Sequence, residues 1–362
     1  MSSIDKGDFC FRGGDVQILV KGEGDTVIRG LVYSQVLCLA SEIWGKFIYP
    51  PFPHINSPTK KSSTGVSTTS TKDDGRIYSA RKKNDIQREI IAEIDFTDDD
   101  PEALLILLKI AHHRIKTIPK ELSRETLFNI AGLVEQYQVL DLVKPYISTW
   151  LTEIWDNIPK WINQGLEKTL FIAYVFGQQQ EFINISSTIV MHITVESNET
   201  LFFSSKHVGG EVALDLLPPG LQDNMRVARG AAKAAIVKFI DRIVTYIRKL
   251  DREESEDQSD DGINGVVFNE AGFVSDLFKE ALKPLETGMF NGTLRRTFHR
   301  VSQVLQRMFN SAYQYYYRAV YKSFHELRME LLKEVEAEIA KALLTEDLKA
   351  HMDRAKEQLE WA

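Results

Sequence analysis

Residues Ile94 to Ala111 read IDFTDDDPEALLILLKIA. The alternation of Ile94 and Phe96 indicates the end of a strand, whereas the apolar run that follows predicts a helix. Between them lie three aspartates and a proline. A carboxylate caps the free N–H groups of a helix and proline suits its first turn, so this order predicts a strand, a turn and then a helix. Because Glu102 to Ala111 is apolar at most positions, we expect this helix to be buried on several sides.

A second block of strand and helix character lies upstream, between Gly14 and Trp44. The alternating apolar residues of Val16 to Val20 predict a half-buried strand, and Thr26 to Val32 is its expected hairpin partner. From Ser34, which can act as a helix N-cap, the apolar spacing becomes helical and continues to Phe47. The chain is therefore expected to begin with a small antiparallel sheet followed by a helix.

Residues 50–85, which separate these two blocks, are rich in Ser, Thr and Lys. Such a composition buries too little apolar surface to offset its ordering entropy, so it predicts a disordered insertion within one folded domain. The hydroxyl groups beside lysines between Lys60 and Lys83 suit phosphorylation, a weak nuclear signal or a plain solvated loop.

The rest of the chain is predicted to be mainly helical. Expected helices run from Arg124 (capped by Ser123) to Gln136, Leu140 to Trp155, Leu166 to Gly177, Phe182 to Val195 and Asp223 to Leu250. The predicted organisation is a domain at 8–152, a helical extension at 153–250, an acidic linker at 251–265 and a helical or coiled-coil-like region at 266–362.

An apolar stripe recurs every three or four residues from Leu294 to about Leu344, which predicts one helix of about 50 residues or two helices with a kink. Leu305, Tyr316, Leu327 and Leu331 are the predicted partner contacts. The basic aromatic part, 294–325, suits either nucleic-acid binding or pairing with the acidic half that begins at Glu326.

Composition and motifs argue against several classes of protein. The formal charge of −7 disfavours overall affinity for nucleic acid, and two cysteines, Cys10 and Cys38, build no disulfide framework. We expect an intracellular protein, cytoplasmic or nuclear, because no apolar run approaches the roughly 20 residues of a membrane helix and no signal peptide is visible.

Catalytic and metal chemistry is not expected. Adjacent residues such as His112 and His113 point about 100° apart on a helix, which disfavours a metal site. The segment Gly22 to Asp25 suits a hairpin turn better than a dinucleotide-binding loop. No nucleophile with a paired base is evident, so we expect a non-enzyme without cofactor or metal.

Three short blocks, in their order and spacing, resemble a BTB/POZ domain of the fungal type. They are Gly14-Asp15-Val16, then Val32-Tyr33-Ser34-Gln35-Val36-Leu37 with Ser41-Glu42-Ile43-Trp44, and finally Ile94 to His112, continued to Trp150. The resemblance covers about residues 13–152 and extends more weakly to about 250. It implies an α+β fold in which a small sheet is flanked by helices. Tyr33 stands where the family has histidine, and Glu42 where it has proline.

The resemblance also implies a function, namely a non-catalytic protein–protein interaction adaptor that associates with itself or docks partners. Some family members recruit a cullin-type ubiquitin ligase through an apolar-x-Glu motif after the third-block helix. Here Glu121 lies one position late, so ligase recruitment is the alternative function, and Ile115, Lys116 and Ile118 are the predicted docking residues. A nucleic-acid-associated regulator that uses 294–325 is the alternative from another class.

Overall fold

The computed structural model describes residues 7–50, 90–156, 165–195, 201–203, 210–211, 217–257, 276, 278–280, 294–309 and 324–360. Its contacts divide the chain into a first unit, Met1–Pro119 with Gly132–Val143, and a second unit, Lys120–Ala131 with Lys144–Ala362. Residues 51–85 of the predicted insertion, 258–265 of the predicted linker and Tyr316 lie outside the described residues.

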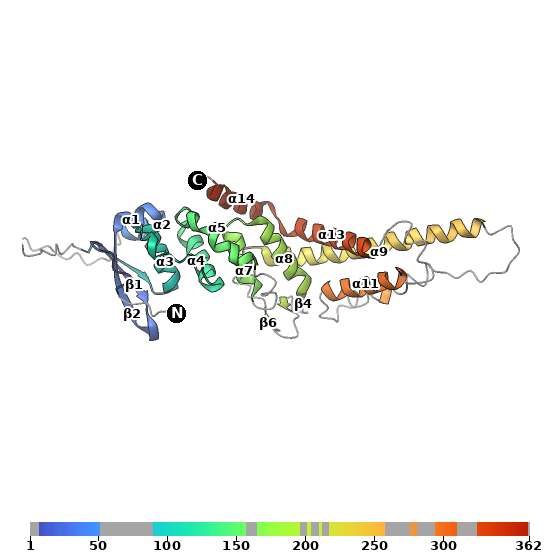
Figure 1. The fold of residues 1–362 in the computed structure, drawn as a ribbon, viewed down its shortest axis with the longest axis horizontal. Coiled ribbons are helices and arrows are strands. Elements are labelled where there is room, and N and C mark those ends of the chain that lie inside the picture. Colours follow the sequence, from blue (N-terminus) through green and yellow to red (C-terminus); the bar gives the residue numbers. More distant parts are fainter. Residues whose placement is uncertain are drawn as a thin grey trace, which may run out of the picture. The chain divides into compact units, whose positions relative to one another are not determined.

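The first unit contains a three-stranded sheet in the order β2-β1-β3 (Figure 1). Strand β1 (Val16–Lys21) pairs antiparallel with β2 (Val27–Val32) and parallel with β3 (Ala92–Phe96). The predicted strands are confirmed, but the parallel pairing with β3 makes the sheet mixed where an antiparallel sheet was expected. The buried side chains of Val16, Ile18 and Val20 show the alternation of a one-sided sheet. Together with the surrounding helices, this sheet places the chain in the broad α+β class.

The outer edge of β2 is covered by the residues that precede the sheet. Phe11 N–H donates to the Leu31 carbonyl at 2.8 Å, and Leu31 N–H donates to the Phe9 carbonyl at 3.0 Å. Both phenylalanine side chains are buried. The approach is so close that a Cβ at Gly30 would lie 2.7 Å from Phe9 Cβ, which makes glycine necessary there. The sequence did not predict this contact.

The helix expected from Ser34 to Phe47 is in fact two helices, α1 (Ser34–Ala40) and α2 (Glu42–Ile48). Ser41 breaks the helix with an extended backbone, and its Oγ accepts from the N–H groups of Ile43 and Trp44. The predicted N-cap at Ser34 is also wrong. Its N–H and its hydroxyl both donate to the Asp15 carboxylate, at 2.7 and 2.8 Å, so the capping acceptor comes from the residue just before β1.

Helix α3 (Pro101–Ala111) confirms the predicted junction. Asp100 Oδ1 accepts from Ala103 N–H at 2.9 Å, and proline occupies the first turn. Most of the helix is buried, as its apolar sequence predicted. The predicted helices after it are confirmed as α4 (Arg124–Tyr137) and α5 (Leu140–Asp156), and the division between the units falls within α4.

The described helices of the second unit beyond α5 are α7 (Leu166–Val175), α8 (Gln179–His192), α9 (Leu221–Asp257), α11 (Leu294–Phe309), α13 (Phe324–Leu343) and α14 (Glu346–Glu360). A small antiparallel sheet in the order β4-β5-β6 (Ile193–Val195, Leu201–Phe203, Gly210–Glu211) was not predicted. The helix expected from Phe182 to Val195 therefore ends three residues early. None of the helices, within the residues described, is long and apolar enough to cross a membrane.

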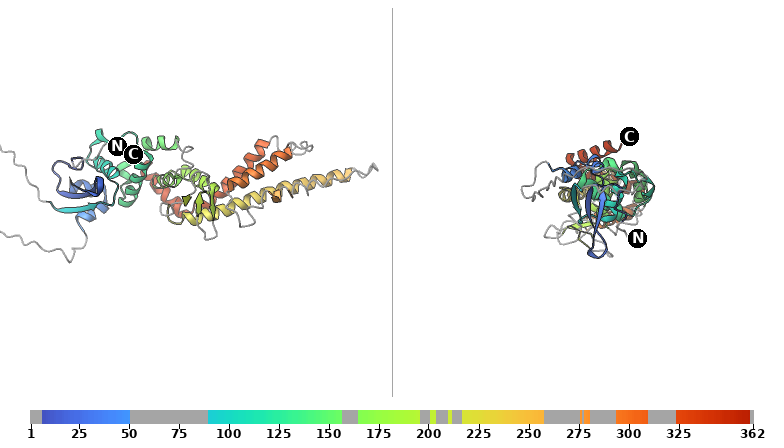
Figure 2. Two further views of the ribbon diagram at one scale, coloured as in Figure 1. Left: turned by 90° about the horizontal axis from the view of Figure 1, so that it is seen from below. Right: turned by 90° about the vertical axis from the view of Figure 1, so that its left-hand side faces the viewer.

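Helices α9 and α13 lie side by side in the second unit (Figures 1 and 2). Arg242 of α9 pairs with Glu330 and Glu334 of α13, at 3.0 and 2.6 Å. Helix α9 also continues to Asp257, seven residues into the tract expected to be a linker. Glu and Arg favour helices, and this part of the sequence contains no glycine or proline, so the helix persists despite its like charges.

Candidate interaction loop

Residues His112 to Ile118, here called the docking loop, follow α3 in the first unit. His113 has a left-handed backbone with φ of 55°, which turns the chain out of the helix. Two backbone hydrogen bonds then close a short 3-10 turn, from Thr117 N–H to the Arg114 carbonyl and from Ile118 N–H to the Ile115 carbonyl. Thr117 Oγ1 also donates to the Arg114 carbonyl, at 2.8 Å. The loop is therefore held by its own backbone.

His112 fixes the start of the docking loop through both of its ring nitrogens. Nδ1 lies 2.8 Å from the Leu108 carbonyl and Nε2 lies 3.2 Å from Tyr33 N–H. A carbonyl only accepts and an N–H only donates, so the geometry selects a neutral ring that carries its proton on Nδ1. Tyr33 in turn donates its hydroxyl to the Arg12 carbonyl. The histidine thereby connects the end of α3 with the beginning of α1.

A stack of side chains supports the same end of α3. The ring of Phe11 lies 3.9 Å from that of His112, with an interplanar angle of 26°. The guanidinium of Arg114 lies 4.2 Å from the Phe11 ring centroid, and its Nη2 donates to the Cys10 carbonyl at 3.0 Å. Cation–π contacts of this kind contribute about 0.5–1 kcal/mol at exposed sites. Cys10 and Phe11 thus hold the docking loop through these contacts, although they lie about 100 positions earlier in the sequence.

Burial lowers the pKa of His112 below its ordinary value. The nearby Arg114 and His113 lower this pKa further, while the hydrogen bond to the Leu108 carbonyl opposes the shift. The neutral ring that the hydrogen bonds require is therefore also the form that the surroundings favour.

The outward side of the docking loop carries Ile115, which is 60% exposed. Lys116 and Thr117 beside it are also exposed, and Ile118 is half-buried. All three predicted docking residues thus lie together on one ordered turn, and two of them face solvent. The arrangement offers one aliphatic contact with a cation next to it, which suits a partner surface with an apolar depression and an acidic rim.

The other predicted partner contacts lie in the second unit and have a different environment. Leu305 of α11 and Leu327 and Leu331 of α13 are all buried, at no more than 2% exposure. Helix α13 packs on α9, and α11 packs on α8, α9 and α13. The parts of the predicted apolar stripe that lie in α11 and α13 are therefore covered by helices of the same chain. Tyr316 lies outside the described residues.

Further exposed apolar side chains in the first unit were not identified from the sequence as candidates for binding. Leu39 of α1 is 89% exposed, and Phe47 and Tyr49, at the end of α2, are exposed as well. Phe47 follows the helical apolar spacing that predicted a core position, and its ring makes a T-shaped contact with that of Tyr137. Periodicity identifies a helix face but does not say how deeply each position is buried.

A buried polar network lies at the other end of α3. Tyr137 donates its hydroxyl to Asp99 Oδ2 at 2.5 Å, and its carbonyl accepts from the Ser41 hydroxyl at 2.7 Å. Burial raises the pKa of Asp99, and the hydrogen bond from Tyr137 opposes this shift. Burial also raises the pKa of Tyr137, with Asp99 adding to the effect. The phenol is therefore a donor and the carboxyl group its acceptor.

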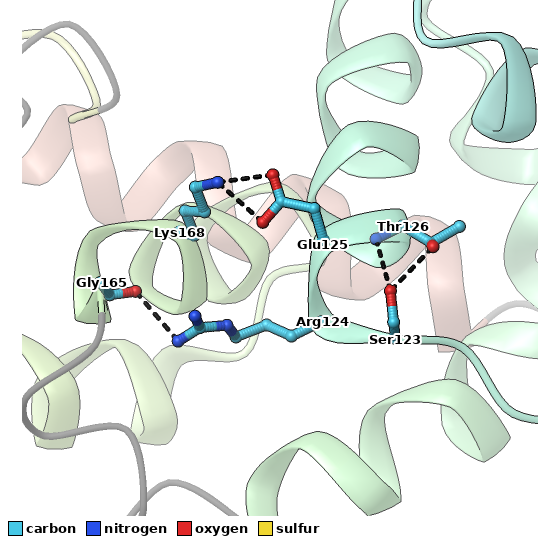
Figure 3. Close-up of polar contacts among 6 residues, drawn as sticks. All are labelled: Ser123, Arg124, Glu125, Thr126, Gly165 and Lys168. Atoms are coloured by element: carbon cyan, nitrogen blue, oxygen red, sulfur yellow. Dashed lines mark hydrogen bonds and ion pairs between the residues drawn. The ribbon is translucent and has the colours of Figure 1, made fainter. Parts of the chain in front are cut away.

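A separate polar cluster joins α4 to α7 within the second unit (Figure 3). Lys168 bridges both carboxylate oxygens of Glu125, at 2.5 and 2.7 Å, and Arg124 donates to the Gly165 carbonyl at 3.3 Å. Ser123 caps α4 as predicted, since its Oγ accepts from Thr126 N–H at 3.0 Å. These contacts are partly exposed, and such pairs contribute about 0.2–1 kcal/mol each. They fix the starts of the two helices.

Across the described ranges, no three His, Cys, Asp or Glu side chains come together as a possible metal site. His112 is engaged by Tyr33 N–H and the Leu108 carbonyl, whereas His113 is exposed. Comparison with known proteins gave no match to a family model, to a curated protein or to a solved structure.

Proposed function

We propose that the protein is a non-catalytic protein–protein interaction adaptor and that the docking loop of its first unit contacts a partner. The observation that carries the proposal is Ile115, an aliphatic side chain that is 60% exposed at the start of the 3-10 turn Ile115–Thr117. The resemblance of residues 13–152 to a BTB/POZ domain supports the same function.

The order of the loop matters as much as its exposure. Partner binding costs free energy whenever a flexible segment must be ordered, about 0.5–1.5 kcal/mol for each side chain that is immobilised. Here His112, Arg114 and the closing backbone hydrogen bonds hold the loop before any partner arrives. A small exposed turn of this kind can therefore contribute useful affinity with little apolar area.

A cullin-type ubiquitin-ligase scaffold is the specific alternative partner. An exposed apolar residue soon after α3 favours it, because the resemblance places a ligase-binding motif at this point of the chain. Self-association through the same loop is the other form of the proposal. Both forms predict that a single change at Ile115 removes the interaction.

The test compares the full chain with Ile115→Asp and with Val227→Asp, a matched control. Val227 lies on α9 and is 62% exposed, so the two variants introduce the same charge at an equally exposed aliphatic residue. Quantitative proximity labelling in cells and sedimentation of the purified proteins are measured for all three.

We expect Ile115→Asp to lose a set of labelled proteins, or a self-associated species, that Val227→Asp retains. If a cullin is in the lost set, the ligase alternative is correct. Identical labelling and identical sedimentation for all three proteins would show that the docking loop contacts nothing.

A further inference from the structure

Among the side chains of α11 that the structure describes, buried and exposed residues lie on two separate sides. Its buried side consists of Leu294, Thr297, Phe298, Val301, Ser302, Val304 and Leu305. Its exposed side consists of His299, Arg300, Gln303, Gln306 and Arg307. We call the second set the cationic face. It follows the spacing of three and four residues that keeps side chains on one side of a helix.

The cationic face stands out against the rest of the chain. The protein has 51 Asp and Glu residues and a net charge of −7, yet the sequence contains no acidic residue from Thr287 to His325. Within the described ranges, neither Arg300 nor Arg307 forms an ion pair with a carboxylate. Helix α13 nearby provides carboxylates, but Glu330 and Glu334 are engaged by Arg242.

The chemistry of the cationic face also distinguishes between partner types. Protein interfaces usually have an apolar centre surrounded by a polar rim. None of the five exposed side chains is apolar, because the apolar side of α11 is already buried against α8, α9 and α13. The cationic face carries the N–H groups of guanidinium and amide side chains. One of these amides, that of Gln303, donates to His299 Nε2 at 3.0 Å. These groups suit phosphate oxygens.

We infer that the cationic face of α11 binds the phosphate backbone of a nucleic acid without reading its sequence. Arg300 and Arg307 are two helical turns apart, roughly 10 Å along the axis. A duplex carries about one negative charge for every 1.7 Å of its axis, so both guanidiniums can reach phosphates of the same molecule. The inference does not depend on the docking loop, which lies in the first unit.

The test measures fluorescence anisotropy of labelled DNA and RNA probes of about 20 nucleotides, single-stranded and duplex, with the full chain at about 50 and 200 mM salt. The variant is Arg300→Gln with Arg307→Gln. The control is Lys333→Gln with Lys341→Gln, which removes the same charge from exposed positions of α13. A third variant, Arg300→Lys with Arg307→Lys, retains the charge. Circular dichroism checks that all three fold.

We expect the full chain to bind with an affinity that falls steeply with salt. The glutamine variant should bind on the order of tenfold more weakly at low salt, and its slope of log Kd against log salt should decrease by about 2. The lysine variant and the α13 control should stay within about twofold of the unmodified chain.

Three results would overturn the inference. The first is the absence of binding by the unmodified chain at low salt. The second is equal binding by the glutamine variant and the α13 control. The third is binding of a labelled oligoglutamate peptide with the same affinity and the same dependence on Arg300 and Arg307, which would identify an acidic protein as the partner instead.

Discussion

Each end of helix α3 carries an ionisable side chain that accepts a hydrogen bond, a base at one end and an acid at the other. At the C-terminal end His112 accepts a hydrogen bond from Tyr33 N–H, and at the N-terminal end Asp99 accepts one from the Tyr137 hydroxyl. Burial disfavours the charged form of both groups, so it lowers the pKa of the histidine and raises that of the aspartate. Burial therefore makes the stability contributions of the two ends respond to pH in opposite directions.

The largest effect is expected from Tyr137→Phe. This change removes the Tyr137 donor from the buried Asp99, which keeps its hydrogen bond with Gln136, and it also removes the hydroxyl that accepts from Gln136 Nε2. We expect the first unit to lose about 2–3 kcal/mol of opening free energy. Native-state hydrogen exchange of peptides from α1 and α3 measures this loss.

Tyr146→Phe is the control for this change, because the structure gives the ring of Tyr146 a stacking contact with Trp150 and its hydroxyl no hydrogen bond to the described residues. We expect this control to change the protein's stability by less than about 0.5 kcal/mol. Equal losses in the two variants would show that the contact between Tyr137 and Asp99 contributes nothing.

The next effect is expected from His112→Phe, which retains a ring against Phe11 and removes both ring hydrogen bonds. The hydrogen bond from Tyr33 N–H to His112 is then lost, and we expect a loss of about 1–2 kcal/mol in the same exchange measurement. His113→Asn is the control, since His113 is exposed and asparagine tolerates its left-handed backbone. A control that loses as much as His112→Phe would contradict the role assigned to His112.

A smaller effect is expected on the stability of the protein as the pH is lowered. Because the pKa of His112 is lower in the folded state than its ordinary value of 6.5, the unfolded chain binds more protons between the two pKa values. The contribution of His112 to stability is therefore complete above pH 6.5 and decreases as the pH falls towards the folded pKa. Hydrogen exchange at several pH values, corrected for intrinsic rates, should show this decrease in the unmodified chain. The decrease should be smaller in His112→Phe, and curves of equal slope would contradict the assignment.

The stability contribution of Asp99 is expected to change with pH in the opposite direction, because its folded pKa is raised above 3.8. The folded state then binds more protons, so the Asp99 contribution becomes more favourable as the pH falls through the folded pKa towards 3.8. Asp99→Asn keeps an acceptor for Tyr137 and removes the charge. We expect this variant to be at least as stable as the unmodified chain at neutral pH and to lack the acid-side gain. If it retains that gain, another group is responsible.

The local features at α3 could be predicted because their parts are adjacent in the sequence. Asp100 caps the helix three residues before Ala103, and the composition of the helix already implied its burial. The features that were missed depend on distant pairs. Asp15 caps α1 from 19 positions away, His112 meets Tyr33 across 79 positions, and Ser41 reaches Tyr137 across 96. A single sequence shows that such side chains exist but not which of them meet.

The candidate sites show the same division. Ile115 was predicted as a docking residue and is exposed on an ordered turn. The periodicity of Leu305, Leu327 and Leu331 identified an apolar face correctly, yet it could not indicate that helices of the same chain cover that face. The contacts of the Phe11 ring with His112 and with Arg114 were missed because nothing in the spacing of these residues links them.

The parallel pairing of β1 with β3 also has a consequence for synthesis. The side chains of Gln17 and Glu93 are hydrogen-bonded although 76 positions of sequence separate them. Strands β1 and β2 therefore leave the ribosome well before β3 is synthesised. At about 5–20 residues per second the delay is about 4–15 s. A two-stranded hairpin alone is only marginally stable. The hairpin of β1 and β2 therefore waits several seconds for the strand that completes its sheet.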